Sequence, residues 1–384
     1  MVRRDFWLHA LERAWERRSV VWLAGVRRSG KTSLCQTLDE IVYLDCELPR
    51  VRRALEDPEA FLRSTKGQRI VLDEIHRLAD PSELLKIAAD HFPETRVVAT
   101  GSSTLDASAK FRDTLTGRRE TLWLTPMIAA DATAFGDDSL SRRFLHGGLP
   151  PHFLSTTVPE RDFVDWIDSY WAKDVQELFK LERRWSFARF VELLLASSGG
   201  MFEATRYAGP CEVSRQTVSN YLAVLETTFV VQVVRPYSRR RTTEIVAAPK
   251  VYGFDTGFVC HYRGWDSLRP DDCGELWEHF VLNEIQARLQ RRAVRYWRNK
   301  RGAEIDFVLP RRGERGPVAI ECKWRATSFD ATALGSFRDL HPNGPNYVVA
   351  PDVSEPYRRT HGDLDVEYLP LARLIERLQT EPLA

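Results

Sequence analysis

A glycine-rich segment near the N-terminus carries the clearest chemistry in the sequence, because residues 25–32 fit the pattern G-x-x-x-x-G-K-[ST] completely. The backbone N–H groups of such a loop wrap phosphate oxygens, and the dipole of the helix that follows adds a positive potential. Lys31 would reach the β- and γ-phosphates, and the Thr32 hydroxyl would bind Mg²⁺. The remaining residues expected at the phosphates are Gly25, Arg28, Ser29, Gly30 and Ser33. The pattern therefore predicts ATP and Mg²⁺ as cofactors.

Two adjacent carboxylates, Asp73 and Glu74, follow an apolar run farther along the chain. One acid at such a place can hold Mg²⁺ through water, and its neighbour can polarise the water that attacks a phosphate. We assign Asp73 to the metal and Glu74 to the general base. The alternative is a pair of solvated acids at the end of a strand.

Thr100 and Arg118 are candidates for contact with the terminal phosphate. Thr100 opens a polar cluster where a γ-phosphate sensor would lie beside Glu74, and ordinary turn chemistry is the alternative. Arg118 follows a glycine and could act as an arginine finger on the nucleotide of a neighbouring subunit, an effect worth about 10³–10⁵ in rate. Such a finger requires a homo-oligomer, for instance a hexamer. A surface salt bridge is the alternative role for Arg118.

Regular elements are needed to position these side chains. Short apolar runs separated by helical stretches are the pattern of a parallel α/β sheet. The runs that we predict as strands are Val20–Ala24, Ile41–Asp45, Arg69–Asp73 and Arg96–Thr100. The fold class is therefore α/β, with an N-terminal P-loop parallel sheet domain at residues 1–155.

Two further domains are expected after the first. Residues 156–255 are predicted to form a helical and winged-helix domain, and residues 256–384 an α/β domain. The last domain begins with a long helix signal at 275–289. Its predicted strands lie at 296–297, 305–309 and 318–323.

The middle region contains a predicted helix with a polar face. Ser214 is a good N-cap, and apolar residues recur at helical spacing after it. The polar positions that a recognition helix would present to a groove are Arg215, Gln216 and Asn220. The wing that should follow would carry Arg239, Arg240 and Arg241. We expect a winged helix that contacts DNA, and the alternative is a winged helix that docks only proteins.

Three charged residues near the C-terminus could form a second reactive site. Alternation along a strand places Glu321 and Lys323 on one face, where Asp306 and Glu321 could hold Mg²⁺ and Lys323 could orient water. Glu278 or Glu284 on the preceding helix is a further candidate acid. This spacing resembles the PD-(D/E)XK nuclease core, although a fold does not establish cleavage. The alternative is a set of charged residues on an exposed strand.

Basic residues greatly outnumber acidic ones between residues 288 and 325. Tyr296, Trp297 and Trp324 are interleaved with them, and a basic surface with aromatic side chains suits a phosphate backbone or stacked bases. A solvated face with snorkelling arginines is the alternative.

The overall charge balance limits these interpretations. The 384 residues include 55 Lys plus Arg and 54 Asp plus Glu, for a formal net charge of +1, which excludes only a uniformly basic nucleic-acid binder. Six dispersed cysteines without C-x-x-C pairs argue against a disulfide framework and a zinc site. Apolar runs fall short of the ~20 residues of a membrane helix, and no export signal is visible. We expect a cytoplasmic protein without membrane contact.

In order and spacing, these motifs resemble those of prokaryotic AAA-family (AAA+) ATPases that carry a C-terminal domain of unknown function. The resemblance rests on residues 25–32, 72–75, 100–103 and 115–118, and it extends through 145–150. His76 is a departure, since that family often has glutamine there. The resemblance implies an AAA+ ATPase domain and supports a nuclease-like fold at the C-terminus.

These observations lead to an expected function with two alternatives. We expect a Mg²⁺-dependent ATPase whose hydrolysis is coupled to the binding, remodelling or processing of DNA. A nucleotide-controlled switch that binds protein partners, with a catalytically inactive nuclease-like scaffold, is the alternative from a different class. A Mg²⁺-dependent nuclease is the third possibility.

Overall fold

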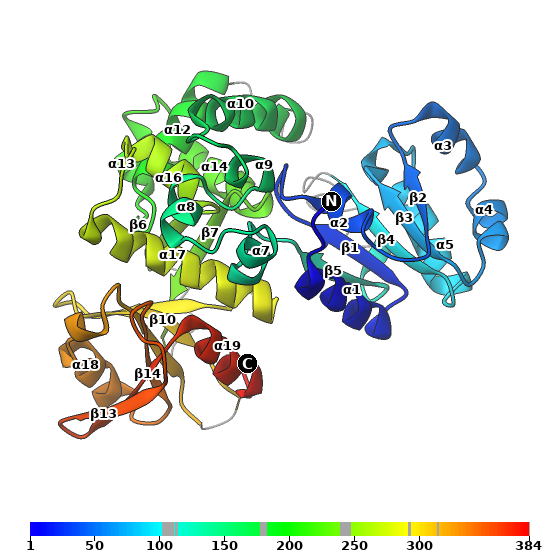
Figure 1. Cartoon of the computed structure of the whole chain (residues 1–384). Helices are drawn as coiled ribbons and strands as arrows, with labels where there is room; N and C mark the ends of the chain where they lie inside the picture. The colour runs from blue at the N-terminus through cyan, green and yellow to red at the C-terminus, as the bar shows by residue number, and fades with distance from the viewer. Residues whose placement is uncertain are drawn as a thin grey trace. The chain divides into compact units, whose positions relative to one another are not determined.

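The chain folds into two units (Figure 1). The computed structural model describes residues 1–101, 111, 114–176, 183–238, 247–290, 293–312 and 315–383. Unit 1 comprises Met1–Ala188 and Asn220–Val230, and unit 2 comprises Arg189–Ser219 and Val231–Ala384. The division of the sequence at residues 155 and 255 stays a prediction. In the described ranges, no helix is long and apolar enough to cross a membrane.

Unit 1 contains a five-stranded sheet in which every neighbouring pair is parallel. In spatial order the strands are β2 (Ile41–Asp45), β3 (Arg69–Asp73), β4 (Arg96–Thr100), β1 (Val20–Ala24) and β5 (Arg119–Trp123). All residues of β1 are buried, as expected for a strand inside a parallel sheet that is covered on both faces. The predicted α/β class is confirmed, four strands have the predicted bounds, and β5 is an addition.

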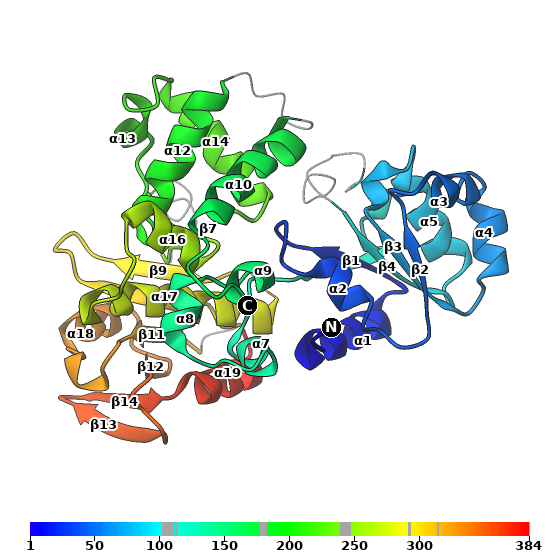
Figure 2. The same ribbon diagram turned by 45° about the horizontal axis from the view of Figure 1, so that its top comes forward.

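Several helices of unit 1 pack against this sheet or flank its edge (Figure 1). α1 (Asp5–Arg17) buries Trp7, Leu11 and Trp15 and packs along β1 and β5. Figures 1 and 2 show α3 (Pro49–Ala54) and α4 (Pro58–Ser64) beyond the β2 edge. The other helices are α2 (Lys31–Cys35), α5 (Pro81–His91), α7 (Ala129–Ala134), α8 (Leu140–Leu145), α9 (Pro150–Phe153) and α10 (Glu160–Tyr170), with a 3₁₀ turn η1 (Ile75–Arg77) and a π-helical turn η2 (Trp171–Val175).

Unit 2 is built around a mixed sheet of nine strands. In spatial order these are β13 (Tyr357–His361), β14 (Leu364–Leu369), β12 (Asn346–Val349), β11 (Val318–Cys322), β10 (Glu304–Leu309), β9 (Arg295–Arg298), β7 (Val231–Pro236), β8 (Lys250–Gly253) and β6 (Gly200–Met201). The three predicted C-terminal strands correspond to β9, β10 and β11. Parallel pairing of β7 with β9 unites strands from the middle and the end of the sequence in one sheet.

The helices of unit 2 include the long helix that the sequence predicts. It is α17 (Pro270–Leu289), which begins before the predicted residue 275 because Pro270 and Asp272 form its first turn. The others are α13 (Ala204–Ala208), α16 (Thr256–Arg263), α18 (Thr332–Leu340) and α19 (Leu371–Thr380), with a 3₁₀ turn η3 (Ala326–Ser328). Two more helices, α12 (Arg184–Ala196) and α14 (Arg215–Thr227), have residues of both units.

The middle of the chain has the element order α12–β6–α13–α14–β7–β8, and the winged helix expected there stays a prediction. The β7–β8 and β8–β6 pairs are antiparallel. The Ser214 hydroxyl accepts a hydrogen bond from the Thr217 N–H at 3.1 Å, so the predicted N-cap of α14 is confirmed.

Candidate functional site

The glycine-rich loop lies between the carboxyl end of β1 and the start of α2. Its backbone is left-handed at Gly25 (φ 148°), Arg28 (φ 61°) and Gly30 (φ 92°). A Cβ atom at Gly25 would lie 2.5 Å from the carbonyl oxygen of Leu124, so only glycine fits there. The helix that follows, α2, has only five residues.

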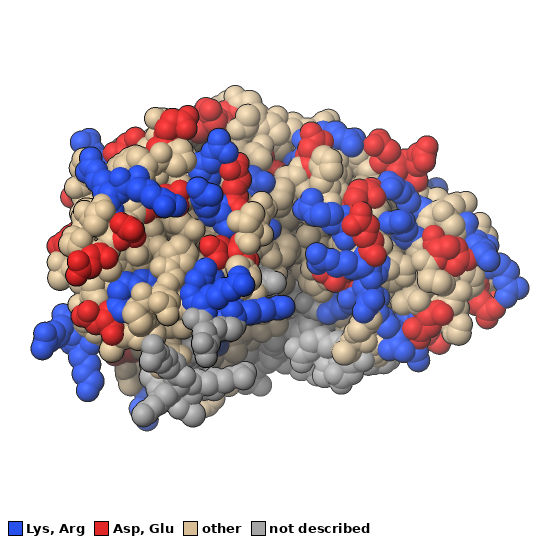
Figure 3. Space-filling view, turned by 90° about the horizontal axis from the view of Figure 1, so that it is seen from below, with Lys and Arg blue, Asp and Glu red and all other residues tan. Residues whose placement is uncertain are grey.

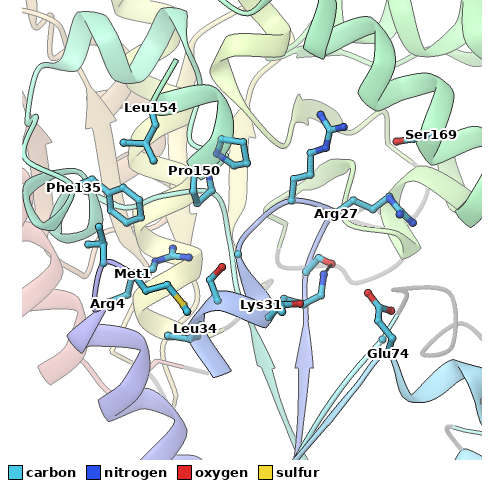
Figure 4. A pocket seen from close by; sticks show the side chains of 18 of the residues that line it. Met1, Arg4, Arg27, Lys31, Leu34, Glu74, Phe135, Pro150, Leu154 and Ser169 are labelled. Atoms are coloured by element: carbon cyan, nitrogen blue, oxygen red, sulfur yellow. Dashed lines mark hydrogen bonds between the residues drawn. The ribbon is translucent and has the colours of Figure 1, made fainter. Parts of the chain in front are cut away.

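The loop forms part of a cavity of about 650 Å³, a size that suits a small-molecule ligand. Figure 4 shows Phe135, Pro150 and Leu154 on one side of this cavity and Arg27 and Glu74 on the other. The predicted phosphate-site residues Gly25, Arg28, Gly30, Lys31, Thr32 and Ser33 all line it. The cavity thus has Arg27, Lys31 and Glu74 at the loop and, opposite, mainly apolar side chains together with Arg4 (Figure 4).

Two polar groups of the loop fit an anionic ligand. The Lys31 ammonium donates to the carbonyl oxygens of Gly25 (2.9 Å) and Val26 (3.1 Å), and burial lowers its pKa while Glu74 and Asp174 oppose that change. The Ser29 hydroxyl oxygen is buried and has no hydrogen-bond partner among the described residues. Phosphate oxygens would give the Ser29 hydroxyl an acceptor and would give Lys31 a further acceptor beside its two carbonyl partners.

Asp73, Glu74 and Thr100 are brought together, as the sequence predicts. Asp73 is 4% exposed, and its carboxylate accepts hydrogen bonds from the hydroxyls of Thr100 and of Tyr43, the latter at 2.5 Å. The Thr100 hydroxyl also accepts from the Glu74 N–H at 3.2 Å. The alternative of two solvated acids is wrong for Asp73. Tyr43 was missed, although the pairing of β2 with β3 places Asp45 opposite Asp73 and Tyr43 two residues away.

Glu74 occupies an unusual backbone conformation at the edge of the cavity. Its φ of 52° lies in the left-handed region, which costs a non-glycine residue about 1–2 kcal/mol. His76 Nδ1 lies 3.1 Å from Glu74 Oε2, and this hydrogen bond holds the pKa of the Glu74 carboxyl below its usual range. Glu74 is thereby kept ionised, as a general base requires.

Arg118 lies away from the phosphate loop of its own chain. Parallel pairing sets Val20 opposite Arg119 and Ala24 opposite Trp123, so Arg118 precedes the amino end of β5 while the loop follows the carboxyl end of β1. The Arg118 guanidinium donates to Asp90 at 2.7 Å. The structure therefore contains the salt bridge that was its alternative role, and a finger role in a neighbouring subunit stays a prediction.

The predicted C-terminal residues form an acidic cluster in unit 2. Antiparallel pairing of Phe307 with Ile320 brings Asp306 beside Glu321. Lys323 Nζ lies 2.6 Å from Glu321 Oε2 and 3.4 Å from Asp306 Oδ2. Glu321 is 5% exposed, so the alternative of an exposed charged strand is wrong for this residue.

Of the two candidate helix acids, Glu278 joins this cluster. Lys250 donates to it at 3.1 Å and Tyr252 at 2.5 Å, whereas Glu284 is paired with Arg288. Burial and the charge of Asp306 raise the pKa of Glu321 to about 8 and that of Glu278 to about 6. No sequence pattern pointed to Lys250 and Tyr252, because they come from β8 in the middle region.

The cluster is only a partial fit to a metal site. Glu321 Oε1 is buried without a hydrogen-bond partner in the described part of the chain, as a ligand oxygen would be. No three His, Cys, Asp or Glu side chains converge on one metal position among the described residues. Lys323 and Lys250 instead supply positive charge directly to the acids.

The residues predicted to meet nucleic acid have mixed outcomes. Arg215, Gln216 and Asn220 are exposed on α14. Arg239, Arg240 and Arg241 lie outside the described residues. Tyr296 and Trp297 are 2% and 5% exposed, so the prediction of stacking aromatics is wrong for both, because β9 is an inner strand of the sheet. Figure 3 shows basic and acidic side chains intermixed over one face of the molecule.

Comparisons with known proteins divide the chain into three matched segments. Residues 17–132 match a family described as an AAA domain. Residues 137–269 and 273–372 match two families described as domains of unknown function, DUF8612 and DUF4143.

Similar whole proteins include two from mycobacteria. Uncharacterized protein Rv2008c of Mycobacterium tuberculosis is 29% identical over 338 residues, which cover 85% of this chain and 75% of that protein. Uncharacterized protein Mb2031c of Mycobacterium bovis gives the same values. Among solved structures, the Walker-type ATPase PABY2304 of Pyrococcus abyssi aligns over 68% of this chain and 96% of its own, with 16% identity and a TM-score of 0.43. From the family matches and the phosphate loop, the chain carries an AAA-type P-loop domain followed by two domains of unknown function.

Proposed function

We propose that this protein is a Mg²⁺-dependent ATPase. The observation that carries the proposal is a cavity lined by the phosphate loop and Glu74, with Thr100 hydrogen-bonded to the Glu74 N–H and to the buried Asp73 carboxylate. The AAA-domain match supports nucleotide binding, typically with Mg²⁺. The apolar side of the cavity suits a nucleobase, and the loop suits the phosphates.

In the proposed reaction each side chain has one role. Lys31 holds the β- and γ-phosphates, and Thr32 and Asp73 would hold Mg²⁺, which offsets phosphate charge when bound. Glu74 accepts a proton from water as the water oxygen bonds to the γ-phosphorus. The bond from that phosphorus to the bridging oxygen breaks, and ADP leaves with the electron pair. Thr100 fixes Asp73 and Glu74 relative to each other, and its role as a γ-phosphate sensor stays a prediction.

Phosphate release by the full chain tests this proposal. The wild type should release phosphate from ATP only with Mg²⁺, and Lys31→Ala should lose both nucleotide binding and turnover because the main phosphate contact is gone. Equal phosphate release by the wild type and Lys31→Ala would refute the site.

We further propose that hydrolysis is coupled to DNA binding, with Arg118 acting across subunits of a homo-oligomer. The exposed polar positions of α14 and the excess of basic residues between 288 and 325 support DNA as the partner. If about five phosphates are neutralised, the log–log dependence of affinity on salt should have a slope of about −4.5. A rate of ATP turnover that is unchanged by single-stranded, duplex and branched DNA would contradict this coupling.

A second candidate function is a nucleotide-controlled protein-interaction switch with an inactive nuclease-like scaffold. The ion pairs of Lys250 with Glu278 and of Lys323 with Glu321 favour this second function, because the lysine ammonium groups can neutralise the acids without a metal. Plasmid cleavage by the wild type and by Asp306→Ala separates the cases. If the domain is a nuclease, the wild type should cut the plasmid and Asp306→Ala should not. If the domain is an inactive scaffold, neither protein should cut the plasmid above background.

A further inference from the structure

Arg27 is a charged residue of the phosphate loop that the pattern leaves unspecified. Its side chain is about one-third exposed and lines the cavity with Lys31 and Glu74. Figure 4 shows Arg27 on the same side of the cavity as Glu74 and Ser169. Burial is the main cause of the lowered pKa of Lys31, and the hydrogen bond with His76 is the main cause of the lowered pKa of Glu74; the positive charge of Arg27 adds a smaller effect in the same direction to both. The guanidinium therefore lies within reach of the place that a terminal phosphate would occupy.

The Arg27 side chain is held by Asp174 in the π-helical turn η2. Arg27 Nη1 donates to Asp174 Oδ2 at 3.1 Å, and the Asp174 side chain is only 2% exposed. The backbone is held as well, since Trp166 Nε1 donates to the Arg27 carbonyl oxygen at 3.1 Å. Single π-helical turns are rare and often occur at functional sites. The turn here brings a buried acid to the guanidinium.

An aspartate in this cavity needs an explanation if the cavity binds a triphosphate. A buried carboxylate repels phosphate oxygens at short range, and low polarity strengthens the effect. Paired with Arg27, the same carboxylate is neutralised and fixes the direction of the guanidinium. Among the described residues, one of the five guanidinium N–H groups is bonded, to Asp174, so the others can donate to a phosphate.

We propose that Arg27 donates in cis to the terminal phosphate of ATP during hydrolysis, with Asp174 as its positioning residue. This inference rests on the proposed ATPase function. The planar Arg27 guanidinium, which belongs to the phosphate loop itself, would donate hydrogen bonds to the negatively charged equatorial oxygens of the γ-phosphoryl group. Arg118 of a neighbouring subunit would be a separate contribution.

Steady-state turnover of the full chain tests this role. Arg27→Ala should lower kcat by about 10²–10³-fold, as the loss of one preorganised donor typically does, while its affinity for ADP stays within about threefold. Added guanidinium ion should restore part of the lost kcat, which a purely structural role would not allow. Asp174→Asn should lower kcat by a smaller factor, about 10-fold, because the donor remains but is less well directed. Arg63→Ala removes an exposed ion pair with Glu59 and should leave kcat unchanged.

Arg27→Lys keeps the positive charge and guards against a folding defect in the alanine variant. It should also lose at least about 10-fold in kcat, because a lysine lacks the planar fork. A wild-type kcat in Arg27→Ala or Arg27→Lys would overturn this inference and would leave the proposed ATPase function unaffected. An equal loss of ATP and ADP affinity without guanidinium rescue would also overturn it. A wild type without ATP turnover would overturn both the inference and the proposed function.

Discussion

The Asp73 carboxylate illustrates how single residues shape the candidate nucleotide site. Hydroxyls from two different strands, Tyr43 on β2 and Thr100 on β4, donate to it. Outer partners of this kind orient a metal-binding carboxylate, and their loss typically lowers metal affinity or activity by about 10–100-fold. Tyr43 is therefore expected to matter for Mg²⁺ without contacting the nucleotide.

Tyr43→Phe tests this expectation with the loss of one hydroxyl group. The variant should need about 10-fold more Mg²⁺ for half-maximal ATP turnover, because Asp73 loses one of the two donors that orient it. A Mg²⁺ titration of the steady-state rate gives the comparison. Nucleotide affinity in the presence of EDTA should match that of the wild type. An unchanged Mg²⁺ requirement would show that Thr100 alone orients the carboxylate.

His279 provides a pH-dependent prediction in unit 2. Its Nε2 lies 2.6 Å from the Ser198 hydroxyl, and burial lowers the pKa of His279 to about 4, from an ordinary value of 6.5. Below pH 6.5 the unfolded state binds a proton at His279 and the folded state does not, which favours unfolding. The contribution of neutral His279 to the stability of the fold is therefore complete above pH 6.5 and is lost as the pH falls from 6.5 to 4. At most about 3 kcal/mol of stability is involved.

His279→Asn removes the titrating group. The melting temperature of the wild type should fall more steeply than that of the variant between pH 6.5 and 4, and the two curves should run parallel above pH 7. Parallel curves over the whole range would mean that His279 does not titrate on unfolding.

Single residues differ in how far the sequence could predict their roles. Lys31, Asp73 and Glu74 belong to local patterns, so their positions could be predicted from neighbours in the chain. Tyr43 and Asp174 act through contacts with residues far away in sequence. A one-dimensional pattern does not contain such pairings, and strand register or a helical irregularity is needed to create them.

Among the structural elements, the phosphate loop depends most strictly on one glycine. Gly25→Ala would place a methyl group 2.5 Å from the Leu124 carbonyl oxygen, in addition to the strain of its positive φ. ATP binding should be lost and the melting temperature lowered.

Gly67→Ala is the matched control, because Gly67 also has a positive φ but a Cβ there has nothing within 4 Å. It should cost only about 1–2 kcal/mol of backbone strain and keep ATP binding. Nucleotide titration of both variants tests the difference, and ATP binding by Gly25→Ala would contradict the close approach of Leu124 to the loop.

Strands of unit 1 were predictable where apolar residues form a continuous run. β1 to β4 are mainly apolar runs, and their bounds follow from the residue types. β5 begins with Arg119, Glu120 and Thr121, so it lacks this apolar signal. β13 is an edge strand with exposed polar residues, which local patterns do not separate from a loop.

At the scale of the whole molecule, the prediction to test is that Arg118 of one copy of the chain acts on the nucleotide of another copy. Within one chain Arg27 lines the cavity at the phosphate loop, whereas Arg118 lies at the opposite end of the strands and pairs with Asp90. If Arg118 acts across subunits, it must leave Asp90 to do so. That pair is accessible to solvent, so breaking it costs little.

Mixing two inactive variants tests action across subunits. Arg118→Ala lacks the finger but keeps its own site, and Lys31→Ala lacks the site but keeps the finger. A mixture should recover a fraction of wild-type ATP turnover, because mixed oligomers pair an intact site with an intact finger. Native mass spectrometry establishes that mixed oligomers form. Mixed oligomers without recovered turnover would exclude a finger role for Arg118.

The identity of the bound nucleotide in Glu74→Gln tests the central claim of ATP hydrolysis most directly. After incubation with Mg²⁺ and ATP, the wild type should yield ADP and phosphate. Glu74→Gln should retain intact ATP with near wild-type affinity and turn over about 10²–10⁴-fold more slowly, because the general base is gone while the phosphate contacts remain. Wild-type phosphate release by Glu74→Gln would contradict the account.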